Sequence, residues 1–384
     1  MYDISLHNLL GKGPTDEDKI DFNKFYSNIK KKINANKTIK KCELCGTENI
    51  KFCNSHTIPQ FVLENISKNG YLYNSQALNI TPLIKEENGL KSTQIFHSIC
   101  TSCDNTLFQD YENNSNYNKA PTQIMLKQIA LKNYLFHKYK LQNDIALMIE
   151  AKNIGDEMPE EAPTSLKVHY KNEQCGIDNL LKARKLDLFH NSDELKKVYK
   201  SLNNREELFK LCYFQKLEYT VPIALQGNSV IYYGFNNRQL NHPFAKNNKG
   251  LVDLHIGIFP FDNFSIVIIF SYKNSDKYNH FFDNLLRYNL STQLSIINFI
   301  IFAYFEDIFL NKNLEKNILN DNNLQVLSQM QTDIVIKLPI YTDTKNVKDK
   351  NILKKQIAIY KENFNLDKHY TIPNLLDEKY SLQN

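Results

Sequence analysis

Four of the seven cysteines in this chain of 384 residues form two pairs with the same spacing. Cys42 and Cys45 make one Cys-x-x-Cys turn, and Cys100 and Cys103 make the other. Each such turn can present two thiolates to one metal ion, and two turns together supply the four ligands of a closed tetrahedral zinc site. The spacing therefore predicts one structural Zn²⁺ held by these four residues. The alternative that it leaves open is four unrelated thiols.

The other three cysteines, Cys53, Cys175 and Cys212, have no paired spacing and are expected to be ordinary buried thiols. The first residues carry neither a basic segment nor a long apolar segment of an export signal, so a cytoplasmic location without disulfides is expected. The most apolar stretch, residues 294–310, is short and is interrupted by polar and acidic residues. It predicts a buried helix, and no membrane partner is expected.

Between the two cysteine pairs lies His56, in the run Asn54-Ser55-His56-Thr57-Ile58-Pro59, and Asp104 directly follows Cys103. A histidine has a pKa near neutrality and can act as a general base, while a carboxylate oxygen suits Mg²⁺. The residues alone leave two other readings open: His56 packed in a hairpin, and Asp104 as a helix cap.

These motifs resemble the HNH endonuclease family, and the resemblance covers residues 40–115. In many members two Cys-x-x-Cys turns hold together a ββα-metal fold. The resemblance implies that His56, within Ser-His-x-Ile-Pro, is the general base that activates water. It also implies that Asp104, within Cys-x-x-Cys-Asp-Asn, holds a catalytic Mg²⁺ or Mn²⁺. The motifs are most similar to HNH proteins of bacterial genomes, including mobile and phage-defence genes.

The chain departs from the family pattern at several positions. Ser55 stands where the family often has a metal-binding Asp, and Asn54 or His97 are candidate replacements. Residues 93–97 lack a match for the family's middle Asn, and the span between the cysteine pairs is longer than usual. Glu112 lies about 12 Å from Asp104 along a continuous helix, so we do not expect one cation to bind both. Glu112 is expected to orient a neighbour or to form a salt bridge.

The formal net charge is +5, and part of it is concentrated before the first cysteine pair. Residues 22–42 contain seven lysines and no acid: Lys24, Lys30, Lys31, Lys32, Lys37, Lys40 and Lys41. This segment is interpreted either as an arm that contacts nucleic-acid phosphates or as a solvated helix face. No glycine-rich phosphate-binding motif is present, so a nucleotide-driven motor is not expected. His137, His169, His190 and His255 have no partners at ligand spacing, and structural roles are expected for them.

Hydrophobic periodicity predicts the elements that must position these residues. A short hairpin is expected within residues 47–57. Helices are expected over residues 16–34, 60–66, 104–112, 121–151, 177–214, 276–288 and 292–309. Strands are expected between residues 217 and 271, with a hairpin near residue 261, and residues 155–163 are expected to form a linker.

The predicted fold class is α+β, with a zinc-stapled ββα-metal (HNH) domain, a helical connector and a C-terminal α+β domain. The expected segments are a basic helical arm (1–39), the nuclease domain (40–115), the connector (116–215), a regulatory or targeting domain (216–330) and a peripheral tail (331–384).

The leading hypothesis is a metal-dependent endonuclease that cleaves DNA phosphodiesters, with phage defence as its setting. RNA is the alternative substrate. A zinc-containing nucleic-acid-binding or regulatory protein without catalysis is the alternative function, favoured by Ser55. A protein partner, or a second copy of the chain, is expected at residues 216–330.

Overall fold

The computed structural model describes residues 41–79, 86–156, 164–242, 251–337 and 361–382, with isolated residues between 20 and 32 and between 354 and 359. Side chains are not described for Ala151, for residues 154–156 and 164–176, or for residues 330–337. The predicted helix over 16–34 and the linker over 155–163 therefore fall largely outside the described residues. The same holds for Lys30, Lys37 and Lys40 and for the side chains of His169 and Cys175.

A seven-stranded sheet forms the centre of the molecule, with the order β3-β2-β9-β6-β7-β8-β5. All of its neighbouring strands are antiparallel. The strands are β2 (Tyr71–Asn74), β3 (Glu87–Gly89), β5 (Phe209–Leu217), β6 (Ile223–Ser229), β7 (Leu254–Pro260), β8 (Ser265–Tyr272) and β9 (Ile308–Leu310). Antiparallel strands combined with helices outside the sheet agree with the α+β class.

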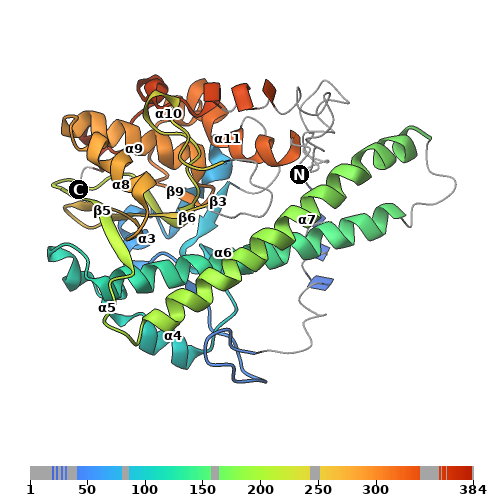
Figure 1. Cartoon of the computed structure of the whole chain (residues 1–384), viewed down its shortest axis with the longest axis horizontal. Coiled ribbons are helices and arrows are strands. Elements are labelled where there is room, and N and C mark those ends of the chain that lie inside the picture. The colour runs from blue at the N-terminus through green and yellow to red at the C-terminus, as the bar shows by residue number, and fades with distance from the viewer. Residues whose placement is uncertain are drawn as a thin grey trace.

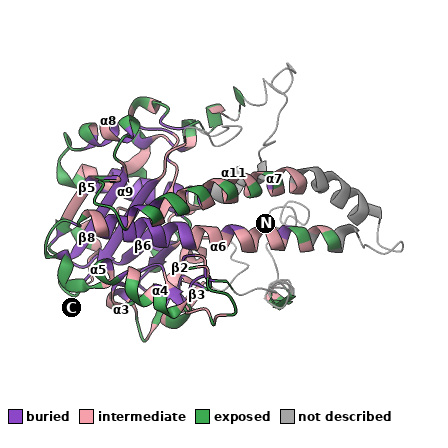
Figure 2. Cartoon of the chain, turned by 60° about the horizontal axis from the view of Figure 1, so that its bottom comes forward, coloured by how far each residue is buried: buried purple, intermediate pink, exposed green. Residues whose placement is uncertain are grey.

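Strand β8 shows why neither face of the sheet is exposed to water. Apart from its two serines, its residues are β-branched or aromatic, and successive side chains point to opposite faces. Val267 and Ile269 pack into one buried cluster, whereas Ile266 and Ile268 pack into another. Both faces of the sheet are therefore covered, and Figure 2 shows the buried strands enclosed by partly exposed helices.

Helices α8 (Asp276–Leu285), α9 (Leu290–Tyr304) and α11 (Asn322–Lys337) cover one face of the sheet. Helices α3 (Gln60–Ile66), α6 (Gln123–Asp156) and α7 (Thr164–Ser201) cover the other. Figure 1 shows α6 and α7 running side by side and extending well beyond the sheet. The short helix α10 (Lys316–Leu319) completes the first layer.

The part that carries the candidate residues is a small lobe of short elements, residues 41–118, which we call the cysteine lobe. It contains β1 (Ser55–His56), which pairs with β4 (Ile95–Phe96), and helices α4 (Thr101–Leu107) and α5 (Gln109–Glu112). The lobe also contains the short 3₁₀ helices η1 (Ser75–Leu78), η2 (Leu90–Ser92) and η3 (Asn114–Asn118), whereas η4 (Phe235–Asn237), η5 (Leu366–Thr371) and η6 (Glu378–Tyr380) lie outside it.

The local prediction of a helix over 60–66 is confirmed, as is the hairpin near residue 261, which joins β7 to β8. The hairpin predicted within 47–57 is wrong. Residues 52–56 pair instead with 95–100, since Phe52 bridges Cys100 and Ser55 lies opposite Phe96. A partner this distant in sequence leaves no local turn signal.

Three other predictions are wrong for the same reason, that pairing or packing partners lie far away in the chain. Residues 209–214 belong to β5 rather than to a helix, because they pair with β8. Residues 308–309 belong to β9, between β2 and β6, rather than to the end of a helix. The described end of the chain is not peripheral, because Phe364, Leu366 and Leu375 are buried in the core.

Strands β2 and β3, from the segment predicted as a nuclease domain, share the sheet with strands of the predicted C-terminal domain. The domain boundaries stay a prediction, but the sheet crosses two of them. Among the described residues, no helix has the length and apolar character needed to cross a bilayer.

Candidate functional site

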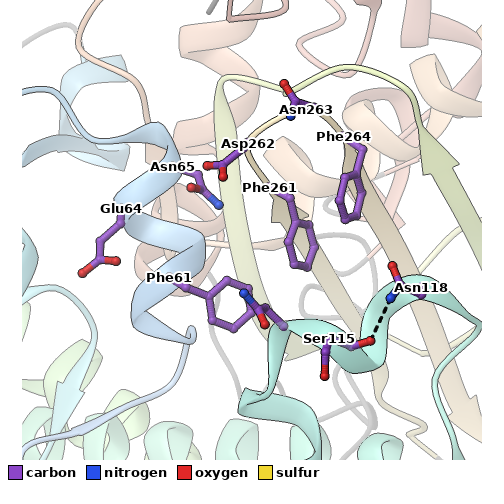
Figure 3. A pocket seen from close by; sticks show the side chains of 10 residues that line it. Phe61, Glu64, Asn65, Ser115, Asn118, Phe261, Asp262, Asn263 and Phe264 are labelled. Carbon is purple, nitrogen blue, oxygen red and sulfur yellow. Dashed lines mark hydrogen bonds between the residues drawn. The ribbon is translucent and has the colours of Figure 1, made fainter.

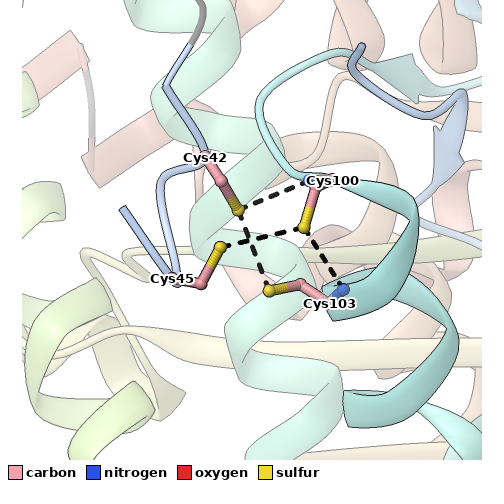
Figure 4. Close-up of side chains that lie close together, drawn as sticks. All are labelled: Cys42, Cys45, Cys100 and Cys103. Carbon is pink, nitrogen blue, oxygen red and sulfur yellow. Dashed lines mark hydrogen bonds between the residues drawn. The ribbon is translucent and has the colours of Figure 1, made fainter. Parts of the chain in front are cut away.

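The four predicted zinc ligands lie together, and their sulfur atoms are all within 4.8 Å of one another. The Sγ atoms of Cys42 and Cys103 are 3.8 Å apart, as are those of Cys45 and Cys100 (Figure 4). Four sulfurs at about 2.3 Å from a tetrahedral zinc are separated by about 3.8 Å. The donor set therefore fits a closed zinc site. This is the only such cluster of possible metal ligands among the described residues.

Local backbone geometry aims the sulfurs at a common point. Gly46 closes the first turn with a φ of +74°, a left-handed conformation that glycine adopts without strain. The amide of Cys100 donates to the Sγ of Cys42 at 3.4 Å, and the amide of Cys103 donates to the Sγ of Cys100 at 3.5 Å. Donors aimed at sulfur stabilise thiolates, the form that binds a metal.

The thiols differ in how readily they ionise. A hydrogen bond with the Thr47 hydroxyl is the main cause that lowers the pKa of Cys45 to about 6. Burial raises the pKa of Cys42 and of Cys103. Two buried thiolates are unfavourable without a cation, so a full set of four thiolates requires a metal ion between them.

His56 stands on β1 with its ring held in one orientation. The Nδ1 atom lies 3.1 Å from the carbonyl oxygen of Thr93, which can only accept a hydrogen bond, so Nδ1 carries the proton. The lone pair is then on Nε2, to which none of the described residues donates a hydrogen bond. Burial is the main cause that lowers the pKa of His56 below its usual 6.5. A neutral imidazole with a fixed tautomer is the form that a general base requires.

Asp104 and Ser55 meet beside His56, although they come from different elements. Asp104 is in the first turn of α4, and the hydroxyl of Ser55 donates to its Oδ1 at 2.6 Å. The resemblance assigned both positions to the catalytic metal. The structure brings the two positions into direct contact, with Ser55 fully buried.

Between these two residues lies a group that the sequence analysis missed, the ammonium of Lys132 on α6. Its Nζ is 2.7 Å from the Oγ of Ser55 and 2.7 Å from the Oδ1 of Asp104. It also donates to the carbonyl oxygen of His56 at 3.1 Å and forms an ion pair with Glu112 at 3.1 Å. We call Ser55, Asp104, Glu112 and Lys132 the Lys132 cluster.

The Lys132 side chain is 1% exposed, and its ammonium lies 4.3 Å from the centre of the Phe108 ring. A lysine is rarely buried unless its charge is paired. One signal was present in the sequence: Lys132 follows Ala130 and Leu131 in a helix whose pattern predicts burial. The sequence could not say which acid it meets, because its partners lie at least 20 residues away in the chain.

The prediction that Glu112 forms a salt bridge is confirmed, because Glu112 pairs with the Lys132 ammonium. That one metal ion does not bind both Asp104 and Glu112 stays a prediction, but the separation on which it was based assumed a continuous helix. The helix breaks at Phe108, between α4 and α5, and the break turns both carboxylates toward the same ammonium. Burial raises the pKa of Glu112.

The two candidate replacements for a metal-binding Asp contact each other, with His97 Nε2 2.9 Å from Asn54 Oδ1. The surroundings of Asp104 do not fit a divalent ion between Ser55 and Asp104, because the Lys132 ammonium lies against both oxygens.

A separate pocket lies between α3, η3 and the turn that joins β7 to β8 (Figure 3). Phe61 and Phe261 line it with the carboxylates of Glu64 and Asp262. Two carboxylates do not favour an anionic phosphate, so this pocket is not assigned to a nucleic-acid backbone.

No family model, no curated protein and no solved structure matches this chain.

Proposed function

We propose that this protein hydrolyses phosphodiester bonds of DNA, with His56 as the general base and a structural zinc at the four cysteines. The zinc would fix the position of α4 relative to β1, because one cysteine pair precedes β1 and the other lies at the start of α4. The observation that carries the proposal is the His56 side chain, neutral and held through Nδ1 by Thr93, with Asp104 among the charges that act on it.

The proposed step needs little from the protein beyond this histidine. Nε2 of neutral His56 accepts a proton from a water molecule, and the resulting hydroxide attacks phosphorus. The bond from phosphorus to one sugar oxygen breaks, and the departing alkoxide takes a proton from solvent water. General-base assistance of this kind contributes about 10²–10⁴ to the rate. The resemblance implies Mg²⁺ or Mn²⁺ at Asp104 as well, but no step is assigned to that ion here, because Asp104 is already bound to Lys132.

The test is nicking of a supercoiled plasmid by the purified protein, compared with His56→Ala. We expect the variant to keep its zinc and its melting temperature and to lose cleavage by about 10²–10⁴. His280→Ala is the matched control, because His280 is exposed on α8 and belongs to no part of the cysteine lobe. An RNA of similar length, assayed in parallel, separates the two substrates.

A second candidate function is supported by one observation. The buried Lys132 ammonium lies 2.7 Å from Asp104 and balances its charge, as expected of a site that serves as scaffold rather than catalyst. In that case the protein is a zinc-containing nucleic-acid-binding or regulatory protein. Binding of DNA with no cleavage above that of His56→Ala would favour this function over hydrolysis.

A further inference from the structure

The strongest unexplained feature of the molecule is a buried lysine at the place where the HNH resemblance implies a metal ion. Ser55 and Asp104 occupy the two positions assigned to metal ligands, and both contact the same Lys132 ammonium. We propose that the ammonium of Lys132 replaces the divalent cation in this site, so that no Mg²⁺ or Mn²⁺ binds between Ser55 and Asp104.

The first argument is the set of oxygen atoms around Nζ. Four oxygens lie within 3.1 Å of it, from Ser55, His56, Asp104 and Glu112. They come from β1 and from the consecutive helices α4 and α5, which lie far from β1 in the sequence. Oxygens that converge on one point from several elements are typical of a cation site, and an ammonium is a compact cation with three donors.

The second argument is steric and electrostatic exclusion. Mg²⁺ binds oxygens at about 2.0–2.1 Å in a near-octahedral shell. An ion at that distance from Asp104 Oδ1 and Ser55 Oγ would occupy the space in which Nζ lies, 2.7 Å from the same atoms. The two positive charges would also repel each other in a site with little water to screen them. The site can hold the ammonium or the ion, but not both.

The third argument is that the Lys132 side chain is buried, so that bulk water cannot replace its protein partners. Its side chain is 1% exposed, and Phe108 and Phe96 lie at 4.3 and 5.7 Å from Nζ. A buried cation remains charged only when acids pair with it, and here two acids do so. Lys132 is accordingly a fixed part of the site rather than a surface group that folds over it.

This inference concerns the same site as the proposed nuclease and rests on that proposal for its catalytic meaning. Lys132 is then a positioning residue: it holds the carbonyl of His56 and the carboxylate of Asp104 without touching substrate. Cleavage by the protein would need no added divalent ion. EDTA used briefly, with the zinc content measured afterwards, would leave nicking within about twofold.

The decisive measurement is binding of Mn²⁺ to the zinc-loaded full chain, followed by electron paramagnetic resonance. Wild type and Asp104→Asn should show the same weak binding, with no saturable site that depends on Asp104. A saturable Mn²⁺ site in wild type that Asp104→Asn removes would overturn the inference. This comparison does not depend on any variant of Lys132.

The second measurement removes the ammonium. Lys132→Ala leaves Asp104 and Glu112 facing an open space, and a saturable Mn²⁺ site should appear that the double variant with Asp104→Asn lacks. Lys138→Ala is the matched control, because Lys138 is also on α6 but pairs with Glu43 outside the cluster. A Lys132→Ala protein that retains its zinc but gains no Mn²⁺ site would also overturn the inference.

The two proposals fail in different ways. If wild type does not cleave DNA, the proposed function fails, while the Mn²⁺ measurements still decide what Lys132 does. In the other case, wild type cleaves only with added Mg²⁺ or Mn²⁺, and Asp104→Asn weakens the activation by that ion. In that result the nuclease stands and the role given to Lys132 is wrong.

Discussion

The four-cysteine cluster and the Lys132 cluster are neighbours, since Cys103 and Asp104 are adjacent in the chain, but they solve the same electrostatic problem differently. Each gathers groups that are negative when ionised. Among the described residues no cation is recognised within the four-cysteine group, and two of the cysteines are buried, so the group is suited to an added metal ion such as zinc. The acids of the Lys132 cluster have a built-in cation at 2.7 and 3.1 Å. A convergent set of ligands is therefore evidence for an added ion only when the protein supplies no cation itself.

The largest expected effect is on the four-cysteine cluster. Cys42→Ser or Cys100→Ser should abolish zinc binding, because a structural zinc contributes about 10–16 kcal/mol of binding free energy that is coupled to folding. Metal analysis should find about one zinc per chain in wild type and little in the variants. Limited proteolysis should then cut within the cysteine lobe. Cys53→Ser is the control, because Cys53 is not one of the four clustered cysteines. Carefully prepared wild-type protein that contains no zinc would contradict the prediction.

The next largest effect should come from breaking the Lys132 cluster. Lys132→Met leaves Asp104 and Glu112 without their cation, and removing one partner of a buried ion pair costs about 3–5 kcal/mol. Denaturation in urea measures the loss in the free energy of unfolding. Asp104→Asn in the same chain should recover part of it. A loss below about 1 kcal/mol would mean that the pair behaves like an exposed one.

A smaller effect links the cluster to pH. His56 acts as a base only when neutral, so nicking should rise with pH and level off above its pKa. Burial, with a contribution from the Lys132 charge, holds that pKa below 6.5, so the midpoint should lie below 6.5. Lys132→Met should move the midpoint upward. Rate profiles of the two proteins test this, and a wild-type midpoint above 6.5 would contradict it.

The smallest effect is expected from the lysine-rich arm, whose charges are outside both clusters. Lys32 is 63% exposed and pairs with Glu150 on α6 at 2.7 Å, a kind of contact worth under about 1 kcal/mol. If the arm contacts phosphates, neutralising Lys30, Lys31 and Lys32 should weaken binding equally on unrelated DNA sequences. The log–log salt slope should fall by about one for each lost contact. An unchanged slope would identify a solvated helix face.

What the sequence predicted well is what nearby residues decide. The two Cys-x-x-Cys turns are local, and the helix over 60–66 starts directly after Pro59, which suits the entry to a helix. The buried strands β7 and β8 are read from apolar runs joined by a short turn. The geometry of His56 was only partly accessible, because its tautomer depends on Thr93, 37 residues later.

What the sequence did not reveal depends on contacts between distant residues. Lys132 meets Ser55 across 77 residues, and no spacing rule connects a lysine on one helix to a serine on a strand. The pairing of β1 with β4 and the joining of β2 to β9 are similarly distant. To detect contacts of this kind, one needs either the structure or covariation between positions in homologous sequences.

Helix α6 limits where this protein can be cut into separate parts. Lys132 completes the cluster, and Asn133 and Tyr134, the next two residues, bond to His255 and Asp253 at the sheet. The cysteine lobe by itself, ending at residue 118, would lose this helix and with it the cation for two of its acids. Recombination that moves the lobe into another protein would succeed only if α6 moved with it. The lobe and α6 must stay together for the Lys132 cluster to be complete.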